Sequence, residues 1–232
     1  LTPLATHDTK RGPDVRARLN LLSWEPDTWF GAVTRWMDMN APLRPAEAPD
    51  PADEWLIFQT MLGAWPIDAV RLREYLTKAM REAKRHTRWE NPQETYENAC
   101  LDYASALLED PRASAFRGEL TAYVDRLVVP TRINGLAQTV LQLTLPGIPD
   151  IYQGTEWWDH SLVDPDNRRP VDYAARAASL DAGIPPLAED EKGLAKQHAT
   201  RSLLALRRAR PELFEGYEAL DLGPGLLGFT RG

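Results

Sequence analysis

Apolar residues recur at helical spacing through most of the chain, and short breaks rich in proline or glycine separate the periodic stretches. Apolar positions at i, i+3 and i+4 are typical of amphipathic helices, which end at glycine or proline. The sequence therefore predicts helices over residues 12–39 (two runs), 53–62, 67–86, 92–108, 113–144 (two runs) and 194–210. The proline-rich stretch 40–52 is predicted to be a loop.

Two short apolar stretches interrupt this pattern, and each leads into polar residues. Residues 1–5 lead into Thr6-His7-Asp8-Thr9-Lys10-Arg11, and residues 145–151 lead into Tyr152, Gln153 and Glu156. Each stretch is typical of a buried strand. In parallel α/β folds, the residues at the carboxyl ends of strands converge on ligands. Residues 216–231 indicate the start of a small β structure.

The order of these elements predicts the fold class. A strand, a long helical excursion, a helix, a second strand and a further helix match the last two β/α units of a (β/α)8 TIM barrel. We expect a mixed α/β, predominantly α-helical chain. Residues 1–11 would form the end of barrel strand 7 and a catalytic loop, and residues 12–126 a helical insertion subdomain. Residues 127–212 would contain barrel helix 7, strand 8, a loop and helix 8, and residues 213–232 the incomplete start of a C-terminal β domain. Because no methionine precedes the first predicted strand, we expect the chain to be part of a longer protein.

Composition narrows the classes of partner. A formal net charge of −7 argues against a nucleic-acid partner, because phosphate binding needs clustered positive charge. The single cysteine, Cys100, excludes an internal disulfide and fits a reducing compartment. No apolar run reaches the roughly 20 residues that span a bilayer. The sequence therefore predicts a cytoplasmic protein without a membrane partner.

Several segments, taken in order, resemble a known enzyme family. His7-Asp8 and the run Pro146-Gly147-Ile148-Pro149-Asp150-Ile151-Tyr152-Gln153-Gly154-Thr155-Glu156 resemble the ends of strands seven and eight in the α-amylase superfamily. Residues 6–11, 82–89 and 162–173 further resemble the malto-oligosyltrehalose synthases of that superfamily. The resemblance extends from residue 2 to about residue 217.

The resemblance implies a role for each candidate site residue. Asp8 matches the third catalytic carboxylate, which stabilises the transition state, and His7 would bind the same sugar ring. Lys10 would orient the glucose that is rearranged. Arg11 has two interpretations: it pairs with a carboxylate of the site, or it caps the loop. Tyr152, Gln153 and Glu156 are expected to bind substrate or, equally, to support the residues that bind it.

The implied activity is that of an isomerase, a (1→4)-α-D-glucan 1-α-D-glucosylmutase of trehalose biosynthesis. The reducing-end glucose of a malto-oligosaccharide would leave its α-1,4 bond and rejoin through an α,α-1,1 bond, with retention. Retaining enzymes use a nucleophile and an acid/base carboxylate about 5–5.5 Å apart. The superfamily segments that carry this pair do not occur in these 232 residues. We therefore expect this chain alone to be inactive and to need the rest of the parent barrel.

No cofactor is expected, and no metal site is expected either, because no histidine or cysteine pair has ligand spacing. His86 and His198 lie in predicted helical stretches and are interpreted as surface or packing residues. Two alternative functions stay open: an α-glucan or malto-oligosyltrehalose hydrolase of the same superfamily, and a non-catalytic helical carbohydrate-binding module. Two parallel strands without barrel neighbours would expose their edges. We therefore expect only the helical part to be stable alone.

Overall fold

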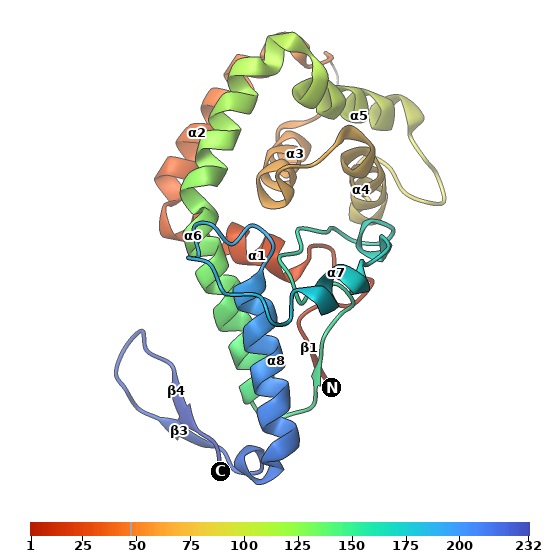
Figure 1. Ribbon diagram of the computed structural model, residues 1–232. Helices are drawn as coiled ribbons and strands as arrows, with labels where there is room; N and C mark the ends of the chain where they lie inside the picture. The colour runs from red at the N-terminus through yellow and green to blue at the C-terminus, as the bar shows by residue number, and fades with distance from the viewer. Residues whose placement is uncertain (47) are drawn as a thin grey trace. The chain divides into compact units, whose positions relative to one another are not determined.

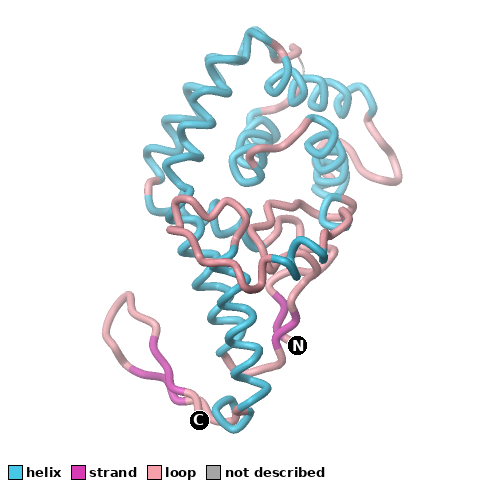
Figure 2. Tube along the Cα trace, in the orientation of Figure 1, coloured by secondary structure: helices cyan, strands magenta, loops and turns pink. Residues whose placement is uncertain are grey.

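The computed structural model describes residues 1–46 and 48–232 (Figure 1). Helices dominate the chain (Figure 2). The strands are only two or three residues long. The helices are α1 (Pro13–Asn20), α2 (Pro26–Asn40), α3 (Pro51–Ala64), α4 (Ala69–Ala83), α5 (Glu94–Glu109), α6 (Ser114–Thr144), α7 (Tyr173–Ala178) and α8 (Leu194–Ala209). The strands are β1 (Thr2–Pro3), β2 (Pro149–Asp150), β3 (Glu218–Leu220) and β4 (Gly228–Thr230). Short 3-10 helices cover Leu21–Trp24, Ala41–Leu43, Pro111–Ala113, Asp166–Arg168 and Pro211–Phe214.

The predicted helices are confirmed, with three corrections. Residues 113–144 form one long helix rather than two, because Pro130 removes only one backbone donor and α6 continues past it. Helix α4 ends at Ala83, since Lys84 adopts a left-handed conformation (φ 57°) and its N–H bonds to Met80 O. His86 therefore lies after the helix, not on it. The predicted loop 40–52 includes residue 47, outside the described residues, and its ends are helical.

The chain divides into two compact units. Unit 1 comprises residues 1–6, 132–159 and 170–232, and unit 2 comprises residues 7–131 and 160–169. Helix α6 contributes its first part to unit 2 and its second part to unit 1. The boundary falls directly after Thr131, one residue beyond Pro130.

Unit 2 contains a dense aromatic and aliphatic core. Trp36 is fully buried, and its ring packs edge-on against Phe58 and Phe116 at centroid distances of 5.8 and 5.4 Å. Within this unit α2 runs beside the first part of α6 (Figure 1). Edge-to-face aromatic pairs contribute about 0.5–1.5 kcal/mol beyond the burial of their area. This core fixes the helices that carry the residues described below.

Unit 1 is built from short strands and two longer helical stretches. Strands β1 and β2 pair in parallel, with Thr2 opposite Pro149, which confirms that the two predicted strands are parallel neighbours. Strands β3 and β4 form an antiparallel pair, as residues 216–231 indicated. Arg207 of α8 donates to Leu143 O at 2.9 Å and so ties α8 to the end of α6. Within the described chain, no helix has the length and hydropathy to cross a membrane.

Candidate active site

Residues 7–12 of unit 2 are held by their backbone on the loop of residues 160–169. Hydrogen bonds that fix the segment run from Gly12 N–H to Ser161 O (2.8 Å), from Val163 N–H to Lys10 O (3.1 Å) and from the Asn167 amide to His7 O (2.9 Å). On the segment these bonds use backbone groups, so the His7 and Lys10 side chains are available for other contacts. The segment that carries the predicted site residues His7, Asp8, Lys10 and Arg11 is therefore held in place by its backbone.

The supporting loop is itself stabilised by a buried carboxylate. The Asp166 side chain is 2% exposed and accepts a bidentate bond from Arg71 of α4, at 2.7 and 2.9 Å. The Leu162 N–H donates to the same carboxylate at 2.7 Å. Burial alone would raise the pKa of Asp166, but these bonds outweigh it and hold the pKa below its usual value. The buried charge of this loop is therefore fully satisfied.

The side chains of His7 and Asp8 are exposed. The Asp8 carboxylate is 67% exposed, and it lies 4.0 Å from His7 Nε2 and 3.7 Å from Lys78 Nζ of α4. Lys10 forms an ion pair with Glu82, one turn further along α4. A carboxylate with this exposure can accept hydrogen bonds from the hydroxyl groups of a bound sugar.

Arg11 makes a different set of contacts. Its guanidinium donates to Gln59 Oε1 at 2.7 Å and lies 3.5 Å from Thr60 Oγ1, and both partners belong to α3. Its backbone oxygen accepts a bond from Arg16 at 3.2 Å. Neither partner of the guanidinium is a carboxylate, so these contacts favour the second interpretation, in which Arg11 caps the loop. Its role in substrate binding stays a prediction.

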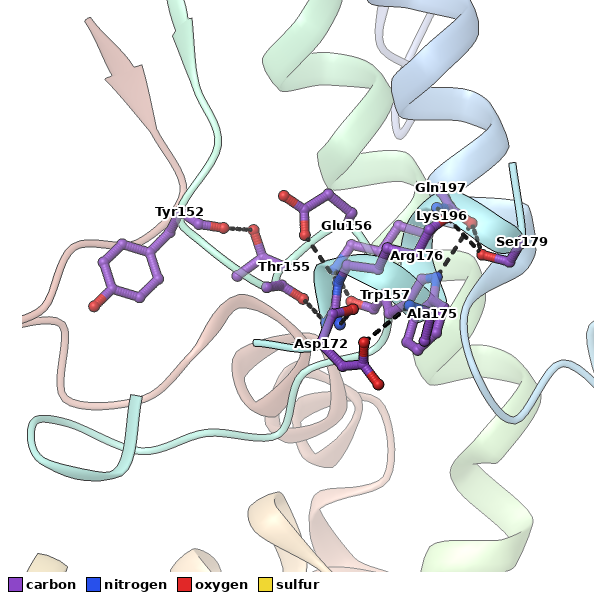
Figure 3. A network of polar contacts seen from close by, with 11 residues as sticks. Tyr152, Thr155, Glu156, Trp157, Asp172, Ala175, Arg176, Ser179, Lys196 and Gln197 are labelled. Carbon is purple, nitrogen blue, oxygen red and sulfur yellow. Dashed lines mark hydrogen bonds and ion pairs between the residues drawn. The ribbon is translucent and has the colours of Figure 1, made fainter. Parts of the chain in front are cut away.

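The other three candidates lie in unit 1, directly after β2. Glu156 forms an ion pair with Arg176 at 3.3 Å, and its side chain is 27% exposed. Arg176 also donates to Gly154 O at 2.9 Å and stacks over Trp157, 4.5 Å from the ring centroid. Figure 3 shows Glu156 directed at Arg176, whereas the Tyr152 ring points away from this network. This geometry favours a supporting role for Glu156.

The seven predicted residues are thus divided between the units. His7, Asp8, Lys10 and Arg11 belong to unit 2, and the candidates that follow β2 belong to unit 1. Gln153 is exposed. Within unit 2 the structure gathers the segment around Asp8 with two charged side chains of α4.

Asp50, Asp53 and His86 form a cluster whose donor atoms lie within 4.8 Å of one another. Arg85 already bonds Asp50 Oδ2 at 2.6 Å and lies 3.4 Å from Asp53 Oδ1. A cation beside both carboxylates competes with a metal ion for them. Asp50, Asp53, Arg85 and His86 therefore form an ion-pair network.

A groove of about 490 Å³ lies between α2 and α6 of unit 2, and none of the predicted site residues lines it. The arginines on its rim are already paired, Arg35 with Glu119 at 2.8 Å and Arg126 with Glu25 at 2.8 Å. The candidate site is therefore the segment around Asp8 and not this groove.

Lys78 and Glu82 were not identified as site residues from the sequence. Both lie in a predicted helix, where exposed charges are ordinary. Glu82 opens one of the segments that carry the family resemblance, and this position was the one available signal. Only the packing of α4 shows that these two side chains face Asp8 and Lys10.

No protein-family model matches the chain. A curated putative maltooligosyl trehalose synthase of Mycobacterium tuberculosis is 39% identical over 245 residues, covering 100% of this chain and 30% of the relative. The solved structure of a mutant maltooligosyltrehalose synthase from Arthrobacter ramosus matches with a TM-score of 0.85 and 41% identity, covering 99% of this chain and 30% of that one.

A solved structure described as a hypothetical maltooligosyl trehalose synthase from Sulfolobus tokodaii matches with a TM-score of 0.82 and 31% identity, covering 98% of this chain and 31% of that one. The chain thus spans about 30% of the length of the relatives that it matches. The comparisons confirm the resemblance: over its whole length this chain is similar to part of the maltooligosyl trehalose synthases.

Proposed function

We propose that this chain is the C-terminal part of an enzyme that converts malto-oligosaccharides to malto-oligosyltrehalose. The reaction is an intramolecular transglycosylation, in which the reducing-end α-1,4-linked glucose is released, turned and rejoined through an α,α-1,1 bond. The carrying observation is the exposed Asp8 carboxylate on a fixed backbone segment, in a chain similar over its whole length to maltooligosyl trehalose synthases.

Asp8 is proposed to accept hydrogen bonds from sugar hydroxyls and to strengthen them in the oxocarbenium-like transition state. His7 binds the same ring, and Lys10 contacts the glucose that turns. Arg11, Tyr152, Gln153 and Glu156 are assigned to substrate binding or to support of the groups that bind it. The fixed backbone of residues 7–12 supports this proposal, because transition-state stabilisation needs donors and acceptors held in advance of the reaction.

The parent fold is proposed to be a (β/α)8 barrel. The parallel pairing of β1 with β2 supports this fold, since adjacent parallel strands are its repeating feature. The nucleophile and the acid/base are assigned to segments outside these 232 residues, so the chain alone is proposed to be inactive. With its single cysteine, the protein is further proposed to be cytoplasmic.

The names of the relatives favour a synthase over a hydrolase of the same superfamily and over a non-catalytic binding module. Product analysis tests the assignment. The full-length enzyme that carries this segment is incubated with maltopentaose, and a non-reducing product of unchanged mass is expected. Release of glucose or trehalose as the main product would exclude the synthase.

A further inference from the structure

Helix α4 presents two opposite charges, one turn apart, to the segment that carries Asp8. Lys78 Nζ lies 3.7 Å from Asp8 Oδ1, and Glu82 is ion-paired with Lys10. Residues at i and i+4 of a helix could pair with each other, but a lysine that precedes a glutamate is the weaker orientation. In this structure Lys78 is directed at Asp8 and Glu82 at Lys10 instead.

The helix that carries these side chains is itself fixed. Arg71, about two turns before Lys78, is bonded to the buried Asp166 carboxylate, and it also donates to His160 O at 3.2 Å. Leu72, Tyr75, Leu76 and Met80 are buried on the inner side of α4. The positions of Lys78 and Glu82 are therefore set by the core of unit 2.

Lys78 also links the two parts of the site. Its ammonium lies 3.4 Å from Asp164 O, and the Asp164 N–H donates to His7 O at 3.3 Å. The Lys78 side chain is 20% exposed, compared with 67% for Asp8. A partly buried cation thus stands beside an exposed carboxylate.

We propose that Lys78 and Glu82 are positioning residues for this site, Lys78 for the Asp8 carboxylate and Glu82 for the Lys10 ammonium. The inference rests on the proposed function. One partner of each pair is more than half exposed, and ion pairs of this kind contribute little to stability, so their role is orientation and not folding. Without Glu82 the long Lys10 side chain samples many rotamers, and the binding of sugar must then restore the order.

The test uses the full-length enzyme with maltopentaose. Glu82→Gln is expected to lower kcat/KM about tenfold, mostly through KM, because the orientation of Lys10 acts on bound sugar in the ground state and the transition state alike. Glu82→Asp is expected to recover most of that loss. The matched control is Glu74→Gln, on an exposed position of the same helix, and it is expected to behave as the wild-type enzyme.

Lys78→Met tests the positioning of Asp8 separately from the positioning of Lys10. It is expected to lower kcat about tenfold with KM nearly unchanged, because Asp8 acts chiefly in the transition state. Lys84→Met, in the exposed turn after α4, is the control. The melting temperatures of all the variants are expected to stay within about 2 °C of the wild-type value, as surface substitutions usually do.

Equal kinetics for Glu82→Gln and Glu74→Gln would overturn the inference, as would a loss of activity that follows a loss of folded protein. The crystal structure of the Glu82→Gln enzyme gives a readout that does not depend on the reaction. Lys10 is expected to leave its position there, and an unmoved Lys10 would contradict the proposal. If the wild-type enzyme makes no non-reducing product, the proposed function fails, whereas the position of Lys10 still decides the inference.

Discussion

The two units of this chain differ in how they are stabilised. Unit 2 contains every residue of the main hydrophobic cluster, whereas among the described residues of unit 1 only Leu143 is a buried hydrophobic side chain. In unit 1 large apolar side chains stay exposed, such as Ile148 at 67% and Leu227 at 67%. Unit 2 therefore has a hydrophobic core of its own, whereas the described residues of unit 1 bury few apolar side chains.

The difference extends to the two carboxylates that follow the strands. Asp8, in unit 2, has a fixed backbone and an exposed side chain, whereas Glu156, in unit 1, is held by Arg176. A group that binds substrate must be oriented and still accessible to it. This difference supports the proposal that Asp8 binds substrate and that Glu156 has a supporting role.

The strongest test of this comparison substitutes each carboxylate by its amide in the full-length enzyme. Asp8→Asn is expected to lower kcat about a thousandfold, an effect of about 4 kcal/mol on the barrier, because an amide is neutral and stabilises less positive charge. Glu156→Gln is expected to stay within about tenfold of the wild-type rate. Rates of non-reducing product formation measure both. Asp8→Asn activity above about a tenth of wild type would contradict the assignment.

A second test compares a buried position of unit 2 with an exposed apolar position of unit 1 in the 232-residue chain. Trp36→Ala, at a fully buried position of unit 2, is expected to lower the free energy of unfolding by about 3–5 kcal/mol. Leu204→Ala is expected to change it by less than about 1 kcal/mol, because the leucine is 40% exposed in unit 1. Urea unfolding followed by tryptophan fluorescence and circular dichroism measures both. Equal losses would remove the distinction between the units.

Limited proteolysis tests the prediction from the sequence that only the helical part of the chain is stable by itself. Cleavage within residues 170–232 of the 232-residue chain is expected to be at least about tenfold faster than cleavage within α1 to α5, because local opening is easier where few apolar contacts are lost. Mass spectrometry of the products identifies the sites. Equal cleavage of both regions would contradict the prediction that the helical part is the more stable one.

Much of this organisation could be predicted from the sequence because it is local. Helical periodicity and proline breaks located the helices, and the short apolar stretches located β1 and β2. The continuity of α6 through Pro130 could not be predicted, because packing along the helix outweighs one lost hydrogen bond.

For the candidate site, too, local sequence patterns do not indicate which residues the tertiary packing brings together. Asp8 follows a predicted strand, and this pattern together with the family resemblance made it a candidate. Lys78 and Glu82 come close to Asp8 and Lys10 only through the packing of α4 on residues 160–169. Charged residues on a helix give no sign of which partner they face. Long-range ion pairs of this kind are specified by the tertiary fold and not by local sequence.

The smallest expected effect concerns the electrostatic part of unit 2's stability. The pKa of Asp166 lies below the ordinary value of 3.8, because its bonds to Arg71 and to the Leu162 N–H outweigh the effect of burial. Its charged form thus stabilises the folded state above the unfolded-state pKa. This contribution is lost as the pH falls from about 4 through the folded-state pKa.

Asp166→Asn isolates that contribution. At pH 6 the variant is expected to be about 2 kcal/mol less stable than the wild-type chain, since Arg71 loses a charged, buried partner. As the pH falls from about 4 through the folded-state pKa, the difference is expected to shrink, because the wild-type carboxyl then takes up a proton and becomes neutral as well. Urea midpoints at about pH 6 and about pH 3 measure it. A difference independent of pH would mean that Asp166 acts through packing alone, and the stability of unit 2 would then rest on its apolar core without an electrostatic tie between α4 and the loop that supports Asp8.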